Sequence, residues 1–129
     1  MIRSILSVVA GVVVAGLVVF VTEAIGHLVF PPPEGTDLSD PEALAAIMDQ
    51  IPLGAKIAVL VAWFLGVLAG CFTALKISRG VSWTGLAVAA VMLAMMGMTL
   101  IAIPHPVWMI IGAVAVTLVG WAGAARLAR

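Results

Sequence analysis

Residues Ile5–Phe30, ILSVVAGVVVAGLVVFVTEAIGHLVF, form a long apolar run that contains only two ionisable side chains, Glu23 and His27. A helix needs roughly 20 apolar residues to cross a 30 Å hydrocarbon layer. At 1.5 Å per residue this run would extend for about 39 Å, so we expect it to tilt or to project beyond the lipid. The stretch therefore predicts a membrane-spanning helix that carries an acid and an imidazole near its C-terminal end.

The composition of the whole chain also indicates that lipid is its solvent. Of its 129 residues, 64% are hydrophobic and 9% are charged, and the mean hydropathy is +1.30. A soluble domain carries about 25% charged residues and about half apolar ones, so the chain has too much apolar surface for a water-soluble core. The bilayer is therefore its expected partner. Six basic residues in small clusters do not predict binding to nucleic acid.

Four apolar segments are long enough to span a bilayer, at about residues 5–30, 53–77, 83–103 and 107–127. Because backbone polar groups cannot face lipid unpaired, each segment is expected to be a helix. The predicted fold class is all-α. Residues 1–129 would form a single transmembrane domain, a four-transmembrane-helix bundle made of two tandem helical hairpins.

The charged residues predict how this bundle is inserted. Five acidic residues lie in or next to the loop 31–52, beside Lys56, whereas the other basic residues fall at the opposite end of the expected bundle, namely Arg3, Lys76, Arg79, Arg126 and Arg129. Positively charged ends of membrane helices tend to stay in the cytoplasm. We therefore expect both termini in the cytoplasm and the acidic loop 31–52 outside.

The loop 31–52 contains a signal for the start of a helix. In Ser39-Asp40-Pro41-Glu42, a capping residue precedes a proline that suits the first turn and an acid that suits the helix dipole. Apolar residues then recur at helical spacing as far as Ile51. The pattern predicts a short amphipathic helix, which would serve either as a capped connector or as a lid over the mouth of the bundle.

Short internal similarities and small residues give further expectations about packing. Residues 70–79 resemble 120–129, and Phe30–Pro33 resembles Ile103–Pro106, which together predict an internal duplication of the helical hairpin. Ridges of small residues let helices approach closely. Such ridges serve either the fold of one chain or contact with a second copy or a membrane-protein partner, and they comprise Gly66, Gly70 and Ala74 in one segment and Gly120 and Ala124 in another.

Three ionisable side chains are candidates for a ligand or proton site. Glu23 and His27 are four residues apart and share one helix face, and His105 lies at the same end of the bundle in the rigid turn Pro104-His105-Pro106. Ionisable groups within membrane segments usually face the bundle interior or a wet cavity. We therefore expect all three to line one outward-facing pocket. The plain alternative is a Glu23–His27 hydrogen bond that only ties helices together.

Two apolar residues are further candidates for the pocket wall. Trp63 lies deeper in its segment than tryptophans that serve as interfacial anchors. Met96 belongs to a methionine-rich segment, and the internal duplication places it at the depth of Glu23. Methionine fills irregular gaps, adapts to flexible ligands and also suits copper(I).

No metal and no other cofactor is predicted. Glu23, His27 and His105 are nevertheless the side-chain types that a divalent ion would require. The single Cys71 excludes an internal disulfide. No nucleophile elbow, phosphate loop or dinucleotide fingerprint occurs, so the chain is not expected to be an enzyme.

Two resemblances carry family expectations. Thr22-Glu23-Ala24-Ile25-Gly26 resembles the first helix of the small multidrug resistance transporters, which implies a proton- and cation-binding role for Glu23, although that family lacks a long acidic loop. A longer pattern is similar to uncharacterised small four-helix bacterial integral membrane proteins. It comprises Glu-x-x-x-His-x-x-x-Pro-Pro, Asp-Leu-Ser-Asp-Pro-Glu and Ile-Pro-His-Pro-x-Trp, found here within 23–33, 37–42 and 103–108. This likeness implies the bacterial inner membrane and no particular activity.

These observations lead to a functional expectation with two alternatives. The chain is expected to be a small multi-pass membrane protein whose polar site, Glu23 and His27 with His105, binds a small ligand or ion or orients a membrane partner. One alternative is a proton-coupled small-molecule transporter that acts as an oligomer. The other is a membrane metal-binding or redox-accessory protein.

Overall fold

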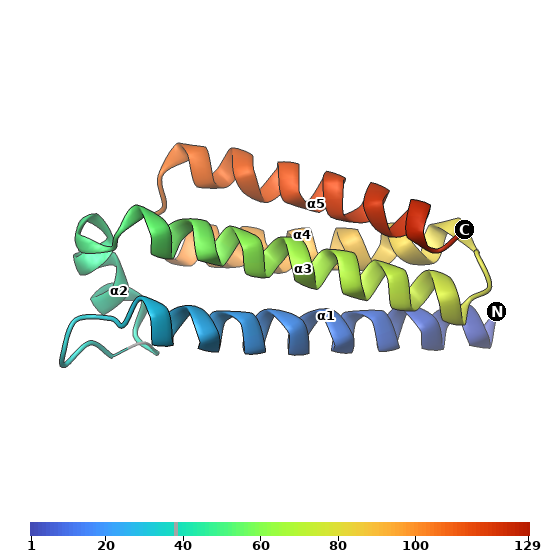
Figure 1. Cartoon of the computed structure of the whole chain (residues 1–129), viewed down its shortest axis with the longest axis horizontal. Helices are drawn as coiled ribbons and strands as arrows, with labels where there is room; N and C mark the ends of the chain where they lie inside the picture. Colours follow the sequence, from blue (N-terminus) through green and yellow to red (C-terminus); the bar gives the residue numbers. More distant parts are fainter. Residues whose placement is uncertain (38) are drawn as a thin grey trace.

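The computed structural model describes residues 1–37 and 39–129. All regular secondary structure in these residues is helical. Four long helices, α1 (Ile2–Val29), α3 (Leu53–Ile77), α4 (Ser82–Ala102) and α5 (Val107–Leu127), run side by side (Figure 1). Each of them is long and apolar enough to cross a membrane. The predicted fold class is therefore confirmed, and α1 begins three residues earlier than expected. Leu38, which belongs to the loop pattern 37–42, lies outside the described residues.

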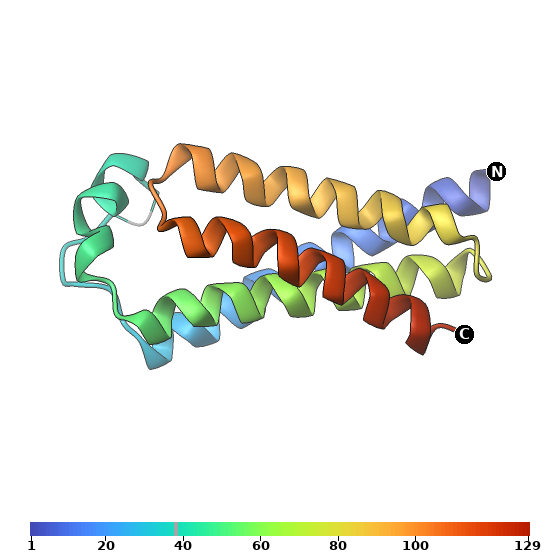
Figure 2. The same ribbon diagram turned by 90° about the horizontal axis from the view of Figure 1, so that it is seen from above.

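A short helical segment interrupts the connection between α1 and α3. It consists of α2 (Pro41–Ile47) and the 3-10 helix η1 (Met48–Gln50). In Figures 1 and 2 it lies across the end of the bundle where α1 and α4 finish and α3 and α5 begin. We call this end of the molecule, together with residues 31–52, the acidic end.

Helix α3 is the centre of the bundle. It packs against α1, α4 and α5, whereas α1 and α5 lie on opposite sides of it (Figure 1). Its buried face supplies much of the core, including Ala62, Trp63, Val67 and Cys71, which are at most 5% exposed. The arrangement is thus a central helix with three neighbours, and the most extensive contact is between α1 and α3.

Small residues explain the close contact between α1 and α3. A Cβ placed on Gly70 would lie 2.6 Å from the backbone oxygen of Gly11, and a Cβ on Gly11 would lie 2.6 Å from the oxygen of Gly70. A Cβ on Gly66 would meet Val19 at 2.4 Å and the Ala15 oxygen at 3.1 Å. Only glycine permits this approach, which gives the two helices their dispersion contacts where no hydrophobic effect drives association.

Both predicted small-residue ridges are used inside the chain. Gly66, Gly70 and Ala74 are buried against α1. Gly120 and Ala124 on α5 are also buried, and a Cβ on Gly120 would lie 3.0 Å from Val67 of α3. Both ridges are therefore occupied by contacts within the chain, which is the first of the two uses that the sequence left open.

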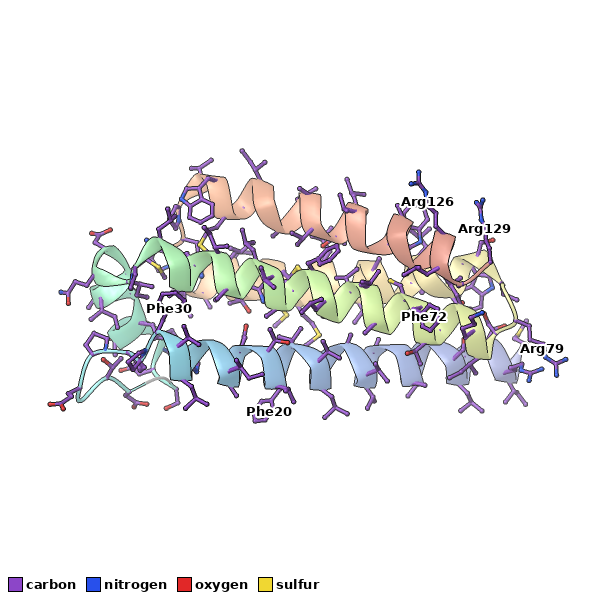
Figure 3. All side chains as sticks on the ribbon, in the orientation of Figure 1. Phe20, Phe30, Phe72, Arg79, Arg126 and Arg129 are labelled. Atoms are coloured by element: carbon purple, nitrogen blue, oxygen red, sulfur yellow. The ribbon has the colours of Figure 1, made fainter. Side chains whose placement is uncertain are left out.

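The outer surface of the bundle is apolar along its length. Leu17, Phe20, Ile111 and Leu118 are between 59% and 72% exposed, and Phe20 points away from the other helices in Figure 3. Such a surface is suited to acyl chains and not to water. The chain is accordingly a multi-pass membrane protein in contact with lipid.

The ionisable side chains mark the two ends of this apolar body. Arg79, Arg126 and Arg129 lie together at the end opposite α2 (Figure 3). All six side-chain carboxylates of the sequence fall between residues 23 and 49, in the last turns of α1 and in the segment that leads to α3. The predicted separation of charge along the bundle is thus present in the structure.

Candidate functional site

A cavity of about 360 Å³ lies at the acidic end of the bundle. Its walls come from the last turns of α1, the first two turns of α3, the turn between α4 and α5, and the segment formed by α2 and η1. Most of the lining is apolar, and the ionisable side chains in it are Glu23, His27, Lys56 and His105. Mainly apolar walls with a few polar groups are the usual form of a small-molecule site.

Glu23 and His27 reach the cavity from the same face of α1. Their spacing of four residues places one above the other along the helix. The Glu23 carboxylate is half-buried and lies close enough to interact with the His27 imidazole and with the indole of Trp63. His27 lies one turn closer to the mouth and is more exposed. The sequence therefore places an acid at depth and an imidazole above it.

His105 lines the cavity from the turn between α4 and α5. Its ring nitrogen Nδ1 lies 2.5 Å from the backbone oxygen of Ile103. A carbonyl oxygen only accepts hydrogen bonds, so Nδ1 must carry the hydrogen. In the neutral ring Nε2 is then an acceptor. Pro104 and Pro106 restrict the backbone on both sides, so this orientation is built into the turn.

The segment formed by α2 and η1 covers the cavity with its apolar side. Asp40 caps α2, its carboxylate accepting the Glu42 N–H at 3.0 Å, and Pro41 occupies the first turn. Leu44, Ile47, Met48 and Ile51 all line the cavity. The predicted short helix is present, and the apolar side of its amphipathic pattern is the side that lines the cavity.

The α-helical part of this segment is shorter than expected. It ends at Ile47 and continues as the single 3-10 turn Met48–Gln50, although the apolar spacing predicted helix as far as Ile51. Ile51 precedes Pro52 and has extended torsion angles, φ −71° and ψ 126°. A residue before proline disfavours the helical region, so Ile51 cannot continue the helical segment, which stops at Gln50.

Lys56 also lines the cavity, although it is not among the site residues expected from the sequence. It lies in the first turn of α3 and lines the cavity together with Ala55 and Val59. Because α1 and α3 form an antiparallel hairpin, the start of α3 must lie beside the end of α1. This antiparallel pairing could have been used to predict that Lys56 lies near Glu23 and His27.

Trp63 and Met96 are buried below the cavity and are not among its lining residues. Trp63 is 5% exposed and contacts the site through Glu23. Met96 is 3% exposed, and its sulfur accepts a hydrogen bond from the Thr117 hydroxyl at 3.6 Å. Thr117 is on α5, so Met96 packs at the contact between α4 and α5. Both residues therefore belong to the packed core beneath the lining residues.

The ionisable groups at the cavity do not form a metal cluster. Within residues 1–37 and 39–129, no three His, Cys, Asp or Glu side chains are placed to hold one ion together. Glu23, His27 and His105 share a cavity of about 360 Å³, which is spacious relative to a single ion. The geometry favours a molecule that spans these groups over an ion that they would enclose.

The core between the cavity and the other end of the bundle is closely packed. Val67, Cys71 and Val88 have no exposed surface, and Met92 is 4% exposed. The Cys71 thiol donates to the Gly85 oxygen at 3.2 Å, which ties α3 to α4. The cavity therefore ends within the acidic half of the molecule.

Comparisons of the chain with protein families, with curated proteins and with solved structures found no match. The family resemblances drawn from short motifs thus gain no support from a longer alignment. The cavity and the chemistry of its lining are therefore the features that bear on function.

Proposed function

We propose that this protein binds one small amphiphilic molecule in the cavity at the acidic end. The observation that supports the proposal best is that Glu23, His27 and His105, which are distant in sequence or on different elements, line one largely apolar cavity. An amphiphile would bury its apolar body against Leu44, Ile47 and other aliphatic side chains. Its polar group would form hydrogen bonds with the ionisable residues.

The size of the cavity suits a compact ligand. Its volume of about 360 Å³ lies at the lower end of the range of roughly 300–1,000 Å³ that is typical of small-molecule sites. A molecule with one or two fused rings, or a short branched chain, fits this range better than a whole lipid. The segment formed by α2 and η1 would then shield the bound molecule from water.

The lining supports binding more strongly than catalysis or transport. No Ser, Thr or Cys side chain is among the lining residues that the structure describes, so hydroxyl and thiol nucleophiles are lacking there. The packed core around Val67 and Val88 offers no route from the cavity to the other end. A transport cycle would require these helices to separate.

The charge pattern supports a particular orientation of the site. By the positive-inside rule, the end with Arg79, Arg126 and Arg129 would face the cytoplasm, and the cavity would open on the outer side of an inner membrane. The protein would then take its ligand from the outer leaflet or from the adjoining water.

A neutral fluorophore tests the proposal directly. The purified chain, in nanodiscs of phosphatidylcholine, is titrated with 1-naphthalenemethanol, and empty nanodiscs correct for partition into lipid. Ala55 lines the cavity, whereas Ala24 is exposed on α1 and lies outside the lining. Ala55→Phe is expected to weaken binding at least about tenfold, or 1.4 kcal/mol, because its ring fills the site. Ala24→Phe adds the same ring outside the cavity and is the matched control.

Two results would overturn the proposal. One is the absence of saturable binding beyond that of empty nanodiscs. The other is equal weakening by Ala55→Phe and Ala24→Phe, which would place the probe in lipid or in a general surface groove. Unchanged thermal unfolding of both variants establishes that the comparison concerns the cavity and not the fold.

A further inference from the structure

The C-terminal end of α1 lacks hydrogen-bond donors. Its last backbone bond runs from the Phe30 N–H to the Gly26 oxygen at 2.8 Å. The next three residues, Pro31–Pro33, have no N–H group, and they occupy the i+4 positions of His27, Leu28 and Val29. The carbonyls of these three residues therefore have no helical donor. His27, Phe30 and the three prolines all line the cavity, so this acceptor-rich helix end lies at its wall.

The turn after α4 repeats the same chemistry. The Ile103 N–H donates to the Thr99 oxygen at 3.0 Å, and Pro104 and Pro106 then remove the i+4 donors of Leu100 and Ala102. His105 between them uses its Nδ1 hydrogen on Ile103 and leaves Nε2 as an acceptor. Of this turn His105 lines the cavity, so the acceptor that the turn presents there is Nε2.

The lining residues in the first turns of α3 and α5 do not supply the missing donors. Pro52 has no N–H, and the N–H groups of Ala55 and Lys56 both bond to the Pro52 oxygen. The N–H of Met109 bonds to the Pro106 oxygen at 3.0 Å. These are the lining residues from the first turns of α3 and α5. Their backbone donors are therefore already used.

The electrostatic field at this end favours a cation. Six carboxylates lie between Glu23 and Asp49, and Lys56 is the one ammonium near them, so the formal charge is −5 with both histidines neutral. The helix dipoles add little net charge here, because the C-terminal ends of α1 and α4 lie beside the N-terminal ends of α3 and α5. A surface of one sign raises the local concentration of ligands of the other sign.

Lys56 is carried nearer the mouth of the cavity than Glu23. Glu23 is level with Trp63, which it contacts, and Lys56 comes seven residues before Trp63 on α3. Seven residues correspond to about 10 Å along a helix axis. The lysine therefore belongs to the mouth, and the carboxylate to the floor.

From these observations we propose that the ligand carries a protonated primary or secondary amine, whose N–H groups bond to Glu23 and to the acceptors in the cavity wall above it. This inference rests on the proposed function and specifies its ligand. An amine of this kind supplies both the positive charge and the donors that the end of α1 and the His105 ring lack. A quaternary ammonium supplies the charge alone, so the site should discriminate against it.

Four probes with one naphthalene body separate these contributions. They are 1-naphthylmethylamine, its N,N,N-trimethyl derivative, 1-naphthalenemethanol and 1-naphthoate, each titrated by calorimetry at pH 7 into the chain in phosphatidylcholine nanodiscs. We expect the primary amine to bind at least about tenfold tighter than the other three, as one charge-assisted hydrogen bond would provide. Equal binding of the trimethyl derivative, or tighter binding of 1-naphthoate, would overturn the inference.

A pair of charge-removing variants locates the effect. Glu23→Gln is expected to reduce the preference for the amine over the alcohol about tenfold, because its amide retains the shape and loses the charge. Asp49→Asn removes an equal charge from a residue outside the lining, and we expect a change of less than about twofold after screening. Equal effects of the two variants would contradict a specific contact in the cavity.

The outcomes also separate this inference from the proposed function. If the alcohol binds in the cavity and the amine shows no preference, the inference is wrong and the proposed function stands. If none of the four probes binds, both are wrong.

Discussion

Replacement of Gly70 by alanine tests whether the close contact between α1 and α3 positions the cavity walls. The new Cβ would lie 2.6 Å from the Gly11 oxygen and 2.7 Å from the Ala15 Cβ. Neither atom belongs to a flexible side chain, so rotation of a side chain cannot relieve the clash. The two helices must move apart to relieve it.

The expected cost follows from a comparison of two glycines. Overpacking of a tight core costs about 1–3 kcal/mol. Alanine also gains up to about 1 kcal/mol over glycine in helix propensity, which offsets part of this cost. A Cβ placed on Gly16 of α1 would meet nothing within 4 Å. Gly16→Ala gains the same propensity without a clash, so the difference between the two variants should be about 1–3 kcal/mol.

Reversible unfolding in mixed micelles of a mild detergent and dodecyl sulfate measures this difference. Gly70→Ala should shift the transition to a lower dodecyl sulfate fraction than Gly16→Ala. Its affinity for 1-naphthalenemethanol should also fall, because Glu23 and the lining residues of α3 are carried by the two separated helices. Equal stabilities would refute the argument that this crossing is limited by backbone contact.

Two further predictions concern the segment between α1 and α3. Asp40→Ala removes the side-chain cap of α2 and should destabilise that helix by about 1 kcal/mol. Amide exchange in 41–47 and dissociation of the probe should then be faster. Glu34→Ala is the control and should change neither rate. Ser39 donates to the Asp37 carboxylate through its hydroxyl at 2.6 Å and its N–H at 3.0 Å, and these bonds lower the pKa of Asp37 below 3.8. The turn is therefore stabilised above that ordinary pKa and weakened as pH falls through the lowered value. Ser39→Ala should raise the pKa of Asp37 towards 3.8 in an NMR titration, and an unchanged pKa would contradict the assignment.

The fold could be predicted from the sequence because it follows from the length of the apolar segments and from the lipid that surrounds them. Each long apolar run must be helical in lipid, and the observed α3 (Leu53–Ile77) and α5 (Val107–Leu127) have the expected limits. The start of α2 was also predictable, because Asp40 and Pro41 act through local geometry. The end of the helical segment at Gln50 was not, because the apolar spacing continued to Ile51, where Pro52 imposes extended backbone.

The cavity was only partly predictable. Glu23, His27 and His105 were selected because ionisable groups are costly at such depth, and all three line the cavity. Lys56 was overlooked because a lysine at the start of a membrane helix is ordinarily an interfacial residue. Its place in the lining depends on how α1 and α3 pair. Met96 was expected in the cavity because of its depth along the helix. Depth, however, does not determine which neighbouring helix a side chain faces.

The use of the small-residue ridges could not be decided from their pattern. Gly66, Gly70 and Ala74 suit a contact within one chain as well as one between copies. The structure places them against α1, where Ala15 and Val19 occupy the space above the glycines. Whether a ridge is used within the chain or between copies depends on the geometry of the hairpin, and the spacing of small residues does not determine that geometry.

Methionine-methyl NMR gives the most direct test of a ligand site at the acidic end. Met48 and Met109 line the cavity, whereas Met95 and Met98 are exposed on α4. In the chain labelled with ¹³C-methyl methionine, titration with 1-naphthylmethylamine should shift the Met48 and Met109 signals together, with one saturating dissociation constant. Met95 and Met98 should respond only as they do to added lipid. Shifts confined to Met95 and Met98, or equal at all four positions, would contradict the existence of the site.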